Sequence, residues 1–254
     1  MSKGRFVWYE LMTTDLPAAR AFYGRVVGWN TVDAKMPGMD YWMFAAGEKT
    51  VAGAMTLPEE ARKMGAPPSW MGYVAVPDVD ASAARATAKG GAVHVPPMDI
   101  PGVGRFAIIA DPQGAAIALF KSSNPAEDEP HVLGTPGFVG WHELYADDQA
   151  TVFPFYAELF GWEKKDAMDM GEMGTYQIFG IGDKSLGGMM NKPPMVPATY
   201  WSYYFNVGNI DEAAERVASA GGRILHGPTE VPGGGWILQA MDPQGAAFAL
   251  LGSR

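Results

Sequence analysis

The chain has 254 residues, of which 48% are hydrophobic and 19% are charged, a composition typical of a globular protein with about two domains. A formal net charge of −9, without a cluster of Lys or Arg, argues against nucleic acid as a partner. The sequence contains no cysteine, which excludes disulfide bonds, thiolate metal sites and a cysteine nucleophile. No apolar stretch is long enough to span a bilayer or to act as a signal peptide, so we expect a cytoplasmic protein without a membrane partner.

The first predicted elements are a strand, a helix and further strands. Residues 6–12 alternate between two faces, as in a half-buried strand. Asp15 is placed to cap the N-terminus of a helix, which ends at Gly28. Strand-like segments follow at residues 41–45 and 50–55.

The same order of elements then starts again. Residues 73–76 read as a strand, and either Asp78 or Asp80 is placed to cap an Ala-rich helix. Three more strands are expected, and the "DPQG" sequence at 111–114 joins the last two. Its Pro and Gly positions favour a type I turn. The segment therefore predicts two successive βαβββ units.

The second half of the chain repeats the motifs of the first. "WYELMTTD" returns as "WHELYADD", "AFYGRVVGW" as "PFYAELFGW", and "DPQGAAIALF" as "DPQGAAFALL". Between the copies lies a polar, acidic segment that reads as a linker. We therefore predict one module at residues 1–123, a linker at 124–136 and a second module at 137–254.

A known family shares this order of motifs. A first strand that ends in Asp, a helix with an "FY" pair and a following "GW", a "GG" pair and a "DPQGA" turn occur in both halves. This order resembles the vicinal oxygen chelate superfamily, which contains glyoxalase I, bleomycin-resistance proteins and extradiol dioxygenases. The resemblance implies an α+β fold of two tandem modules, each a half-barrel of paired βαβββ units around a cavity. It also implies a monomer whose modules form a pseudo-twofold pair.

Enzymes of that family bind a divalent metal through His, Gln or Glu side chains on the strands of each module. The resemblance assigns these positions to aromatic or methyl side chains in both repeats: Trp8, Tyr73 and Ala118, and Trp141, Tyr204 and Ala249. The remaining position falls within 51–55 and within 186–190, where no usual ligand occurs. We therefore expect neither a metal nor another cofactor.

Two carboxylates share the faces of the first strands. Alternation places Glu10 beside Trp8, and Glu143 beside Trp141. A carboxylate buried among aromatic side chains tends to have a raised pKa and can act as a general acid or base, or bind a ligand. The alternative is a structural carboxylate that accepts hydrogen bonds from the backbone or from Tyr hydroxyls.

Many Met and aromatic residues on the expected cavity strands indicate a small, mostly apolar or aromatic organic ligand. We predict a metal-free binding protein and assign no catalytic residue. The predicted binding wall comprises a main group and its weaker equivalent in the other repeat: Trp141, Glu143, Tyr204 and Asn206, and Trp8, Glu10 and Tyr73. One alternative is a glyoxalase-type lyase or extradiol-type dioxygenase with an unrecognised metal site or Glu-based catalysis. Another is an interaction module whose cavities are closed.

Overall fold

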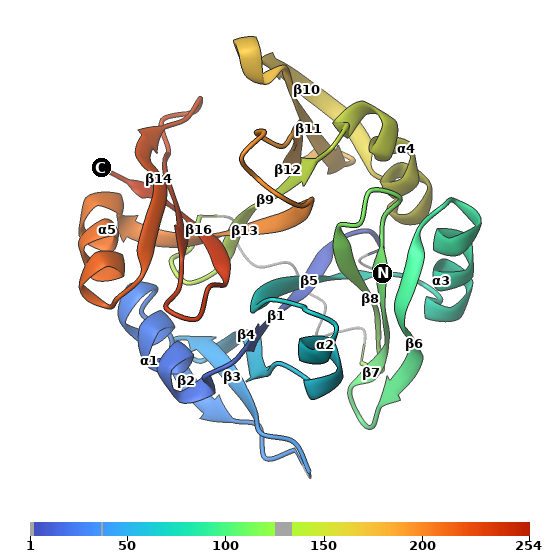
Figure 1. The fold of residues 1–254 in the computed structure, drawn as a ribbon, viewed down its shortest axis with the longest axis horizontal. Helices are drawn as coiled ribbons and strands as arrows, with labels where there is room; N and C mark the ends of the chain where they lie inside the picture. Colours follow the sequence, from blue (N-terminus) through green and yellow to red (C-terminus); the bar gives the residue numbers. More distant parts are fainter. Residues whose placement is uncertain (1–2, 37, 125–133) are drawn as a thin grey trace. The chain divides into compact units, whose positions relative to one another are not determined.

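The computed structural model describes residues 3–36, 38–124 and 134–254. Its strands form two eight-stranded mixed sheets, one in each sequence repeat (Figure 1). Each repeat contains two βαβββ units, so the predicted α+β fold class and the internal duplication are confirmed. Most of the predicted linker, residues 125–133, lies outside the described residues.

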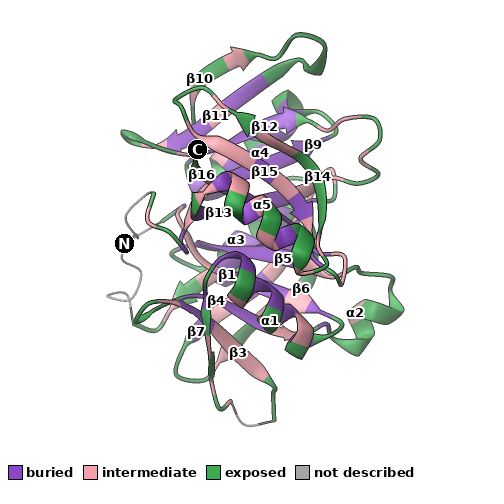
Figure 2. Cartoon of the chain, turned by 90° about the vertical axis from the view of Figure 1, so that its left-hand side faces the viewer, coloured by how far each residue is buried: buried purple, intermediate pink, exposed green. Residues whose placement is uncertain are grey.

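The first sheet contains two parallel pairings and several antiparallel ones. Its strands in spatial order are β2 (Asn30–Asp33), β3 (Tyr41–Ala46), β4 (Lys49–Thr56), β1 (Phe6–Thr13), β5 (Ser69–Ala75), β8 (Ala116–Ser122), β7 (Gly104–Ala110) and β6 (Ala92–Ile100). The helices of this repeat are α1 (Leu16–Val26), α2 (Glu59–Lys63) and α3 (Val79–Ala88). The short helix α2 has no buried residue and joins the two βαβββ units (Figure 2).

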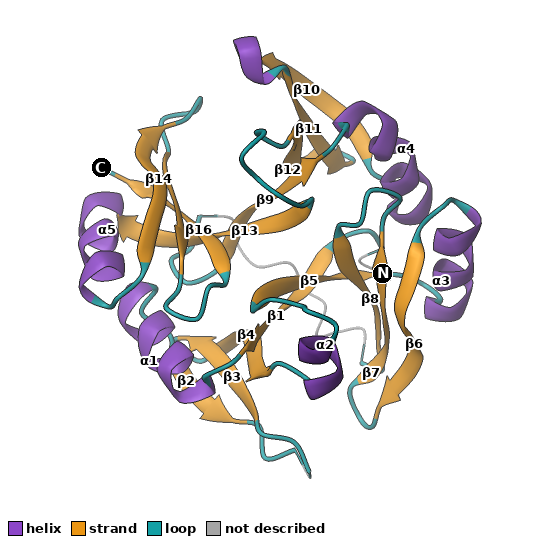
Figure 3. Ribbon diagram, viewed as in Figure 1, coloured by secondary structure: helices purple, strands orange, loops and turns teal. Residues whose placement is uncertain are grey.

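The second sheet repeats this order. Its strands are β10 (Glu163–Asp169), β11 (Thr175–Ile181), β12 (Lys184–Asn191), β9 (Val139–Ala146), β13 (Tyr200–Asn209), β16 (Ala247–Ser253), β15 (Trp236–Met241) and β14 (Arg223–Glu230). The helices are α4 (Gln149–Phe160), a single 3-10 turn, η2 (Gly171–Met173), and α5 (Ile210–Ser219). Each long helix lies against strands of its own βαβββ unit (Figure 3). No helix in the described ranges is both long enough and apolar enough to cross a bilayer.

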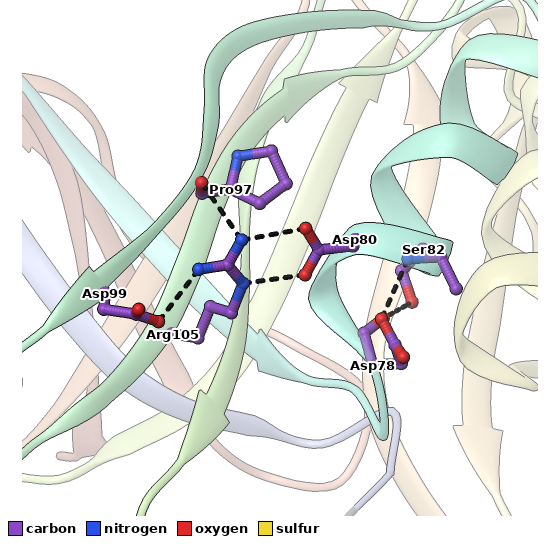
Figure 4. A network of polar contacts seen from close by, with 7 residues as sticks. Asp78, Asp80, Ser82, Pro97, Asp99 and Arg105 are labelled. Carbon is purple, nitrogen blue, oxygen red and sulfur yellow. Dashed lines mark hydrogen bonds and ion pairs between the residues drawn. The ribbon is translucent and has the colours of Figure 1, made fainter.

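The helix caps follow the sequence pattern. Asp15 and Asp78 cap α1 and α3, and each accepts a hydrogen bond from the backbone N–H three residues on, at 3.0 and 2.9 Å. Asp80, the other candidate cap of α3, instead accepts two hydrogen bonds from Arg105 of β7 at 2.7 and 2.8 Å (Figure 4). Arg105 also donates to Asp99 of β6 at 2.9 Å. This ion-pair network connects the first turn of α3 to the β6–β7 hairpin.

The described chain divides into two compact units that cut across the sequence repeats. The first compact unit contains the described residues among 1–7, 72–130 and 142–201, and the second contains those among 8–71, 131–141 and 202–254. Each unit therefore combines one βαβββ segment from each repeat. The boundaries of the sequence modules, 1–123 and 137–254, stay a prediction about which parts of the chain fold as modules.

A buried chain of hydrogen bonds joins the two repeats inside the first compact unit. Trp201 Nε1 donates to the Tyr156 hydroxyl at 3.1 Å, and that hydroxyl donates to Asp111 Oδ2 at 2.7 Å. Asp111 Oδ1 accepts the backbone N–H groups of Gln113 and Ala115 at 2.8 and 3.0 Å. Burial raises the pKa of Asp111, and the hydrogen bond from Tyr156 opposes that rise. The "DPQG" turn of the first repeat is thus fixed to the "FY" helix of the second.

The second compact unit contains the reciprocal arrangement. Trp70 Nε1 donates to the Tyr23 hydroxyl at 2.8 Å, and Tyr23 donates to Asp242 Oδ2 at 3.1 Å. Burial, followed by the negative charge of Asp242, raises the pKa of Tyr23 well above its usual value. Here the "FY" helix belongs to the first repeat and the "DPQG" turn to the second.

The "GW" motifs also bind across the repeats. Trp162 Nε1 donates to the Gly4 carbonyl at 2.6 Å in the first compact unit. Trp29 Nε1 donates to the Gly137 carbonyl at 2.8 Å in the second. The duplicated motifs therefore have a structural role, because a motif of one repeat contacts the other repeat within each unit.

Candidate functional site

The candidate site lies on one face of β1. Trp8, Glu10 and Met12 are half-buried, whereas Tyr9, Leu11 and Thr13, which alternate with them along the strand, are buried. β1 lies between β4 and β5 and is therefore an interior strand, so the partial exposure of these side chains does not arise from a sheet edge. An interior strand that keeps one face accessible offers a surface on which a ligand can bind. We call this face, with the neighbouring side chains of β3 and β4, the open face.

A hydrogen-bonded group occupies the centre of the open face. Trp8 Nε1 donates to the Tyr41 hydroxyl at 3.1 Å, and that hydroxyl donates to the Glu10 carboxylate. Burial, and then the negative charge of Glu10, raises the pKa of Tyr41 far above its usual value, although the hydrogen bond from Trp8 lowers it. Tyr41 therefore stays protonated and is a fixed donor to Glu10.

A glycine makes room for the Tyr41 hydroxyl. Gly53 of β4 is the direct neighbour of Glu10 in the parallel β1–β4 pairing. Tyr41 of β3 pairs with Met55, two residues further along β4. A Cβ atom at position 53 would overlap the Tyr41 hydroxyl oxygen, so only glycine permits this position of the ring. The hydroxyl thus lies over the strand beside Glu10.

The second repeat has the same residue types at the equivalent positions. Glu143 pairs with Gly188, and a Cβ atom at 188 would overlap the ring of Tyr176. These three residues belong to the first compact unit, whereas Trp141, the counterpart of Trp8, belongs to the second, as Trp8 does. Glu143 is only 5% exposed, in contrast to the half-buried Glu10. Burial, and then the charge of Glu143, raises the pKa of Tyr200 to about 12.

Tyr73, the third predicted site residue of the first repeat, lies in the first compact unit. It pairs with Ala118, the other position that the family resemblance assigned on these two strands, in the parallel β5–β8 ladder. Its ring is buried, with the centroids of Phe106 and Phe120 at 6.3 and 6.2 Å. Tyr73 is thus part of an aromatic cluster of that unit.

Tyr204 and Asn206, predicted for the second repeat, are both buried in the second compact unit. Tyr204 pairs with Ala249 and accepts a hydrogen bond from Gln239 Nε2 at 3.0 Å. Asn206 Nδ2 donates to the Thr135 carbonyl at 3.2 Å. The amide nitrogen of Asn206 is therefore bonded to the segment that precedes β9.

The residues present do not fit the divalent metal that the family resemblance implies. The pairings Tyr73–Ala118 and Tyr204–Ala249 place the assigned positions side by side, but a methyl group has no donor atom. Among the described residues, no group of three or more His, Cys, Asp or Glu side chains is placed to hold a metal ion.

The sequence did not identify Tyr41 and Gly53 as site residues, although it contains a signal for them. Both recur as the same residue type in the second repeat, as Tyr176 and Gly188. Their spacing from their counterparts is two residues longer than the spacing between Trp8 and Trp141, because the intervening loops differ in length. A residue-by-residue comparison of the repeats that allows for this insertion finds all four positions.

The comparisons with known proteins agree with this architecture. The family model described as "Glyoxalase/Bleomycin resistance protein/Dioxygenase superfamily" matches residues 5–119 and again residues 135–250. Together the two matches cover most of the chain and follow the two sequence repeats.

Two curated relatives match over nearly their whole length. The Mycobacterium bovis protein named "Putative glyoxylase CFP32" is 35% identical over 251 residues, which are 96% of this chain and 93% of the relative. The "Anthracycline biosynthesis protein DauV" of a Streptomyces species is 30% identical over 260 residues, covering 98% of this chain and 93% of the relative.

Solved structures share the fold at low sequence identity. The Mn(II)-bound glyoxalase from Novosphingobium aromaticivorans has a TM-score of 0.67 and 17% identity, with 99% of this chain and 82% of that chain covered. The 2,3-dioxygenase LapB from Pseudomonas sp. KL28 has a TM-score of 0.68 and 14% identity, with 100% and 93% covered. Similarity at this level of identity supports the fold and leaves the chemistry to the site residues.

Proposed function

Since the chain belongs to the glyoxalase/bleomycin resistance protein/dioxygenase superfamily, we propose that it binds a small, mostly apolar or aromatic organic molecule on the open face, without a metal. One observation carries this proposal: the half-buried Trp8 and Glu10 on an interior strand, with Tyr41 fixed between them by hydrogen bonds. An aromatic surface with few, well-oriented polar groups is typical of small-molecule sites.

The other side chains of the open face are apolar and adaptable. Met12 pairs with Met55, and Met43 is the neighbour of Gly53 on the other side of β4. All three methionines are half-buried. Methionine fills irregular gaps and makes favourable sulfur–aromatic contacts, so these side chains suit an aromatic ligand of varied shape.

The name of the Streptomyces relative points in the same direction. That protein is named for anthracycline biosynthesis, and anthracyclines are polycyclic aromatic compounds. The absence of a fitting metal-ligand set among the described residues favours binding over the metal chemistry of other members.

A second candidate is acid–base catalysis by the hydrogen-bonded pair of Glu10 and Tyr41, which places a carboxylate and a phenol side by side. The two functions differ in outcome, because a binding protein returns the molecule unchanged. Chromatography of any molecule that binds, before and after long incubation with the protein, separates them.

The proposal is tested by titrating the protein with planar fluorescent aromatic probes, including neutral acridone and cationic 9-aminoacridine. Stacking on an aromatic ring contributes roughly 0.5–1.5 kcal/mol beyond area burial, so we expect Trp8→Ala to weaken binding by roughly two- to tenfold. Trp141→Ala in the other repeat is the matched control and should bind as the parent does. If only Trp141→Ala weakens binding, the site lies in the second repeat. If no probe binds to the parent protein, the proposed function is wrong.

A further inference from the structure

The open face has a distinctive charge. Its ionisable groups from β1 and β3 are the Glu10 carboxylate and the protonated Tyr41 phenol. Neither β1 nor β3 contains Lys, Arg or His, and the one base of β4 is Lys49, its exposed first residue. The whole chain has a formal net charge of −9. A ligand on this face therefore meets a negative potential.

The aromatic groups next to Glu10 also favour a positively charged ligand. Trp8 lies two residues from Glu10 on the same face of β1, and Tyr41 is bonded to both side chains. The faces of Trp and Tyr rings attract cations, and Trp attracts them most strongly. A carboxylate bordered by such rings is a typical environment for a protonated amine.

The Glu10 carboxylate is also held in a defined orientation. Tyr41 donates a hydrogen bond to it, Trp8 fixes the Tyr41 hydroxyl at 3.1 Å, and Gly53 leaves room for that hydroxyl. A carboxylate has four lone-pair sites, so it can accept several donors at once. A hydrogen bond between an ammonium group and a carboxylate is about twice as strong as one between neutral groups.

We propose that the molecule bound on the open face carries a protonated nitrogen on its aromatic framework, and that Glu10 binds this cationic group while Trp8 stacks on the rings. This inference rests on the proposed function and adds the charge class of the ligand. It assigns recognition to the first repeat, because Glu143 of the second repeat is 5% exposed whereas Glu10 is half-buried.

Three planar probes of similar size test the charge class: 9-aminoacridine as the cation, acridone as the neutral molecule and anthracene-9-carboxylate as the anion. We expect the cation to bind about tenfold more tightly than acridone, and the anion to bind most weakly. Glu10→Gln removes the charge but keeps an acceptor for the Tyr41 hydroxyl, and it should abolish the difference between cation and neutral probe. The matched variant Glu143→Gln should keep that difference.

The salt dependence of the parent protein provides a second measurement that needs no variant. Added salt should weaken binding of 9-aminoacridine and leave acridone unchanged, because salt screens charge pairs at accessible sites. Equal affinity for the cation and for acridone would overturn the inference and leave the proposed function standing. A charge preference that persists in folded Glu10→Gln would overturn it as well. If no planar probe binds, both the proposed function and this inference are wrong.

Discussion

His142 of β9 is buried, and its burial makes the stability of the protein depend on pH. Its ring stacks on Phe6 at a centroid distance of 3.8 Å, and Nδ1 lies 2.6 Å from the Leu186 carbonyl oxygen. Burial lowers the pKa of His142 from 6.5 to about 4, although the hydrogen bond to Leu186 opposes the shift. The folded protein therefore keeps this histidine neutral where the unfolded chain protonates it.

This difference predicts a loss of stability in acid. Above pH 6.5 neither state protonates His142, and between pH 6.5 and about 4 the unfolded state binds the extra proton. The free energy of unfolding should fall over this range by roughly 3 kcal/mol through this residue alone. Urea denaturation at several pH values should show a flatter pH profile for His142→Gln than for the parent. The control is His226→Gln, at an exposed histidine. An equal change of the pH profile in both variants would contradict the prediction.

At the residue scale, the sequence could identify the carboxylates of the first strands, because alternation alone puts Glu10 beside Trp8 and Glu143 beside Trp141. The sequence could not show which of the two repeats keeps its carboxylate accessible. The exposure of Glu10 and the burial of Glu143 depend on which side chains of other strands cover them, and a local pattern contains no information about that. That Glu10 and Glu143 form part of a binding site stays a prediction.

At the element scale, the "DPQG" turns were predictable and their partners were not. A hydrogen bond from the Gly114 N–H to the Asp111 carbonyl at 3.0 Å closes the first turn, as its Pro and Gly positions indicate. The carboxylate of Asp242 in the second turn, however, is bonded to Tyr23, 219 residues away in sequence. Turn chemistry is local, whereas the pairing of a turn with a distant helix is a property of the packed units. The sequence likewise left open whether Asp78 or Asp80 caps α3. The hydrogen bond from the Ala81 N–H to Asp78 identifies Asp78 as the cap, and Asp80 pairs with Arg105 instead.

The Trp–Tyr–Asp chains should contribute measurably to stability. Tyr156→Phe removes the donor to Asp111 and leaves that buried carboxylate with its backbone partners only. Loss of a hydrogen bond to a buried charged group costs about 1–3 kcal/mol, and we expect the free energy of unfolding to fall by that amount. A double-mutant cycle with Asp111→Asn isolates the pairwise contribution. Additive effects of the two substitutions would show that the hydrogen bond contributes nothing to stability.

At the scale of the whole molecule, the sheets and the compact units divide the chain differently. The sheets follow the two sequence repeats, whereas each compact unit combines segments of both. The sequence predicted the sheets through the duplicated βαβββ order. It could not predict the units, because identical motifs in both repeats are compatible with pairing inside a repeat or between repeats.

The composition of the compact units predicts the result of cutting the chain between its repeats. A protease site introduced within residues 125–133 separates the two repeats covalently, but four buried side-chain hydrogen bonds still join them: Trp162–Gly4, Tyr156–Asp111, Trp29–Gly137 and Tyr23–Asp242. Neither repeat alone can complete either unit. We therefore expect the two fragments to stay together after cleavage, to elute at the mass of one chain and to keep the far-UV circular dichroism of the uncut protein.

The reciprocal experiment makes the same test stricter. Fragments 1–124 and 134–254, expressed separately, should each be unstable or self-associated, because the aromatic surfaces around Tyr23 and Tyr156 lack their partners. Mixing the two fragments during refolding should restore one species of the original mass. Tyr23→Phe combined with Tyr156→Phe removes two of the four hydrogen bonds, so the cut double variant should dissociate at a lower urea concentration than the cut parent. Two stable, monomeric fragments without affinity for each other would contradict the assignment of both units to pairs of segments from different repeats. That result would instead support the sequence modules as independently folding domains.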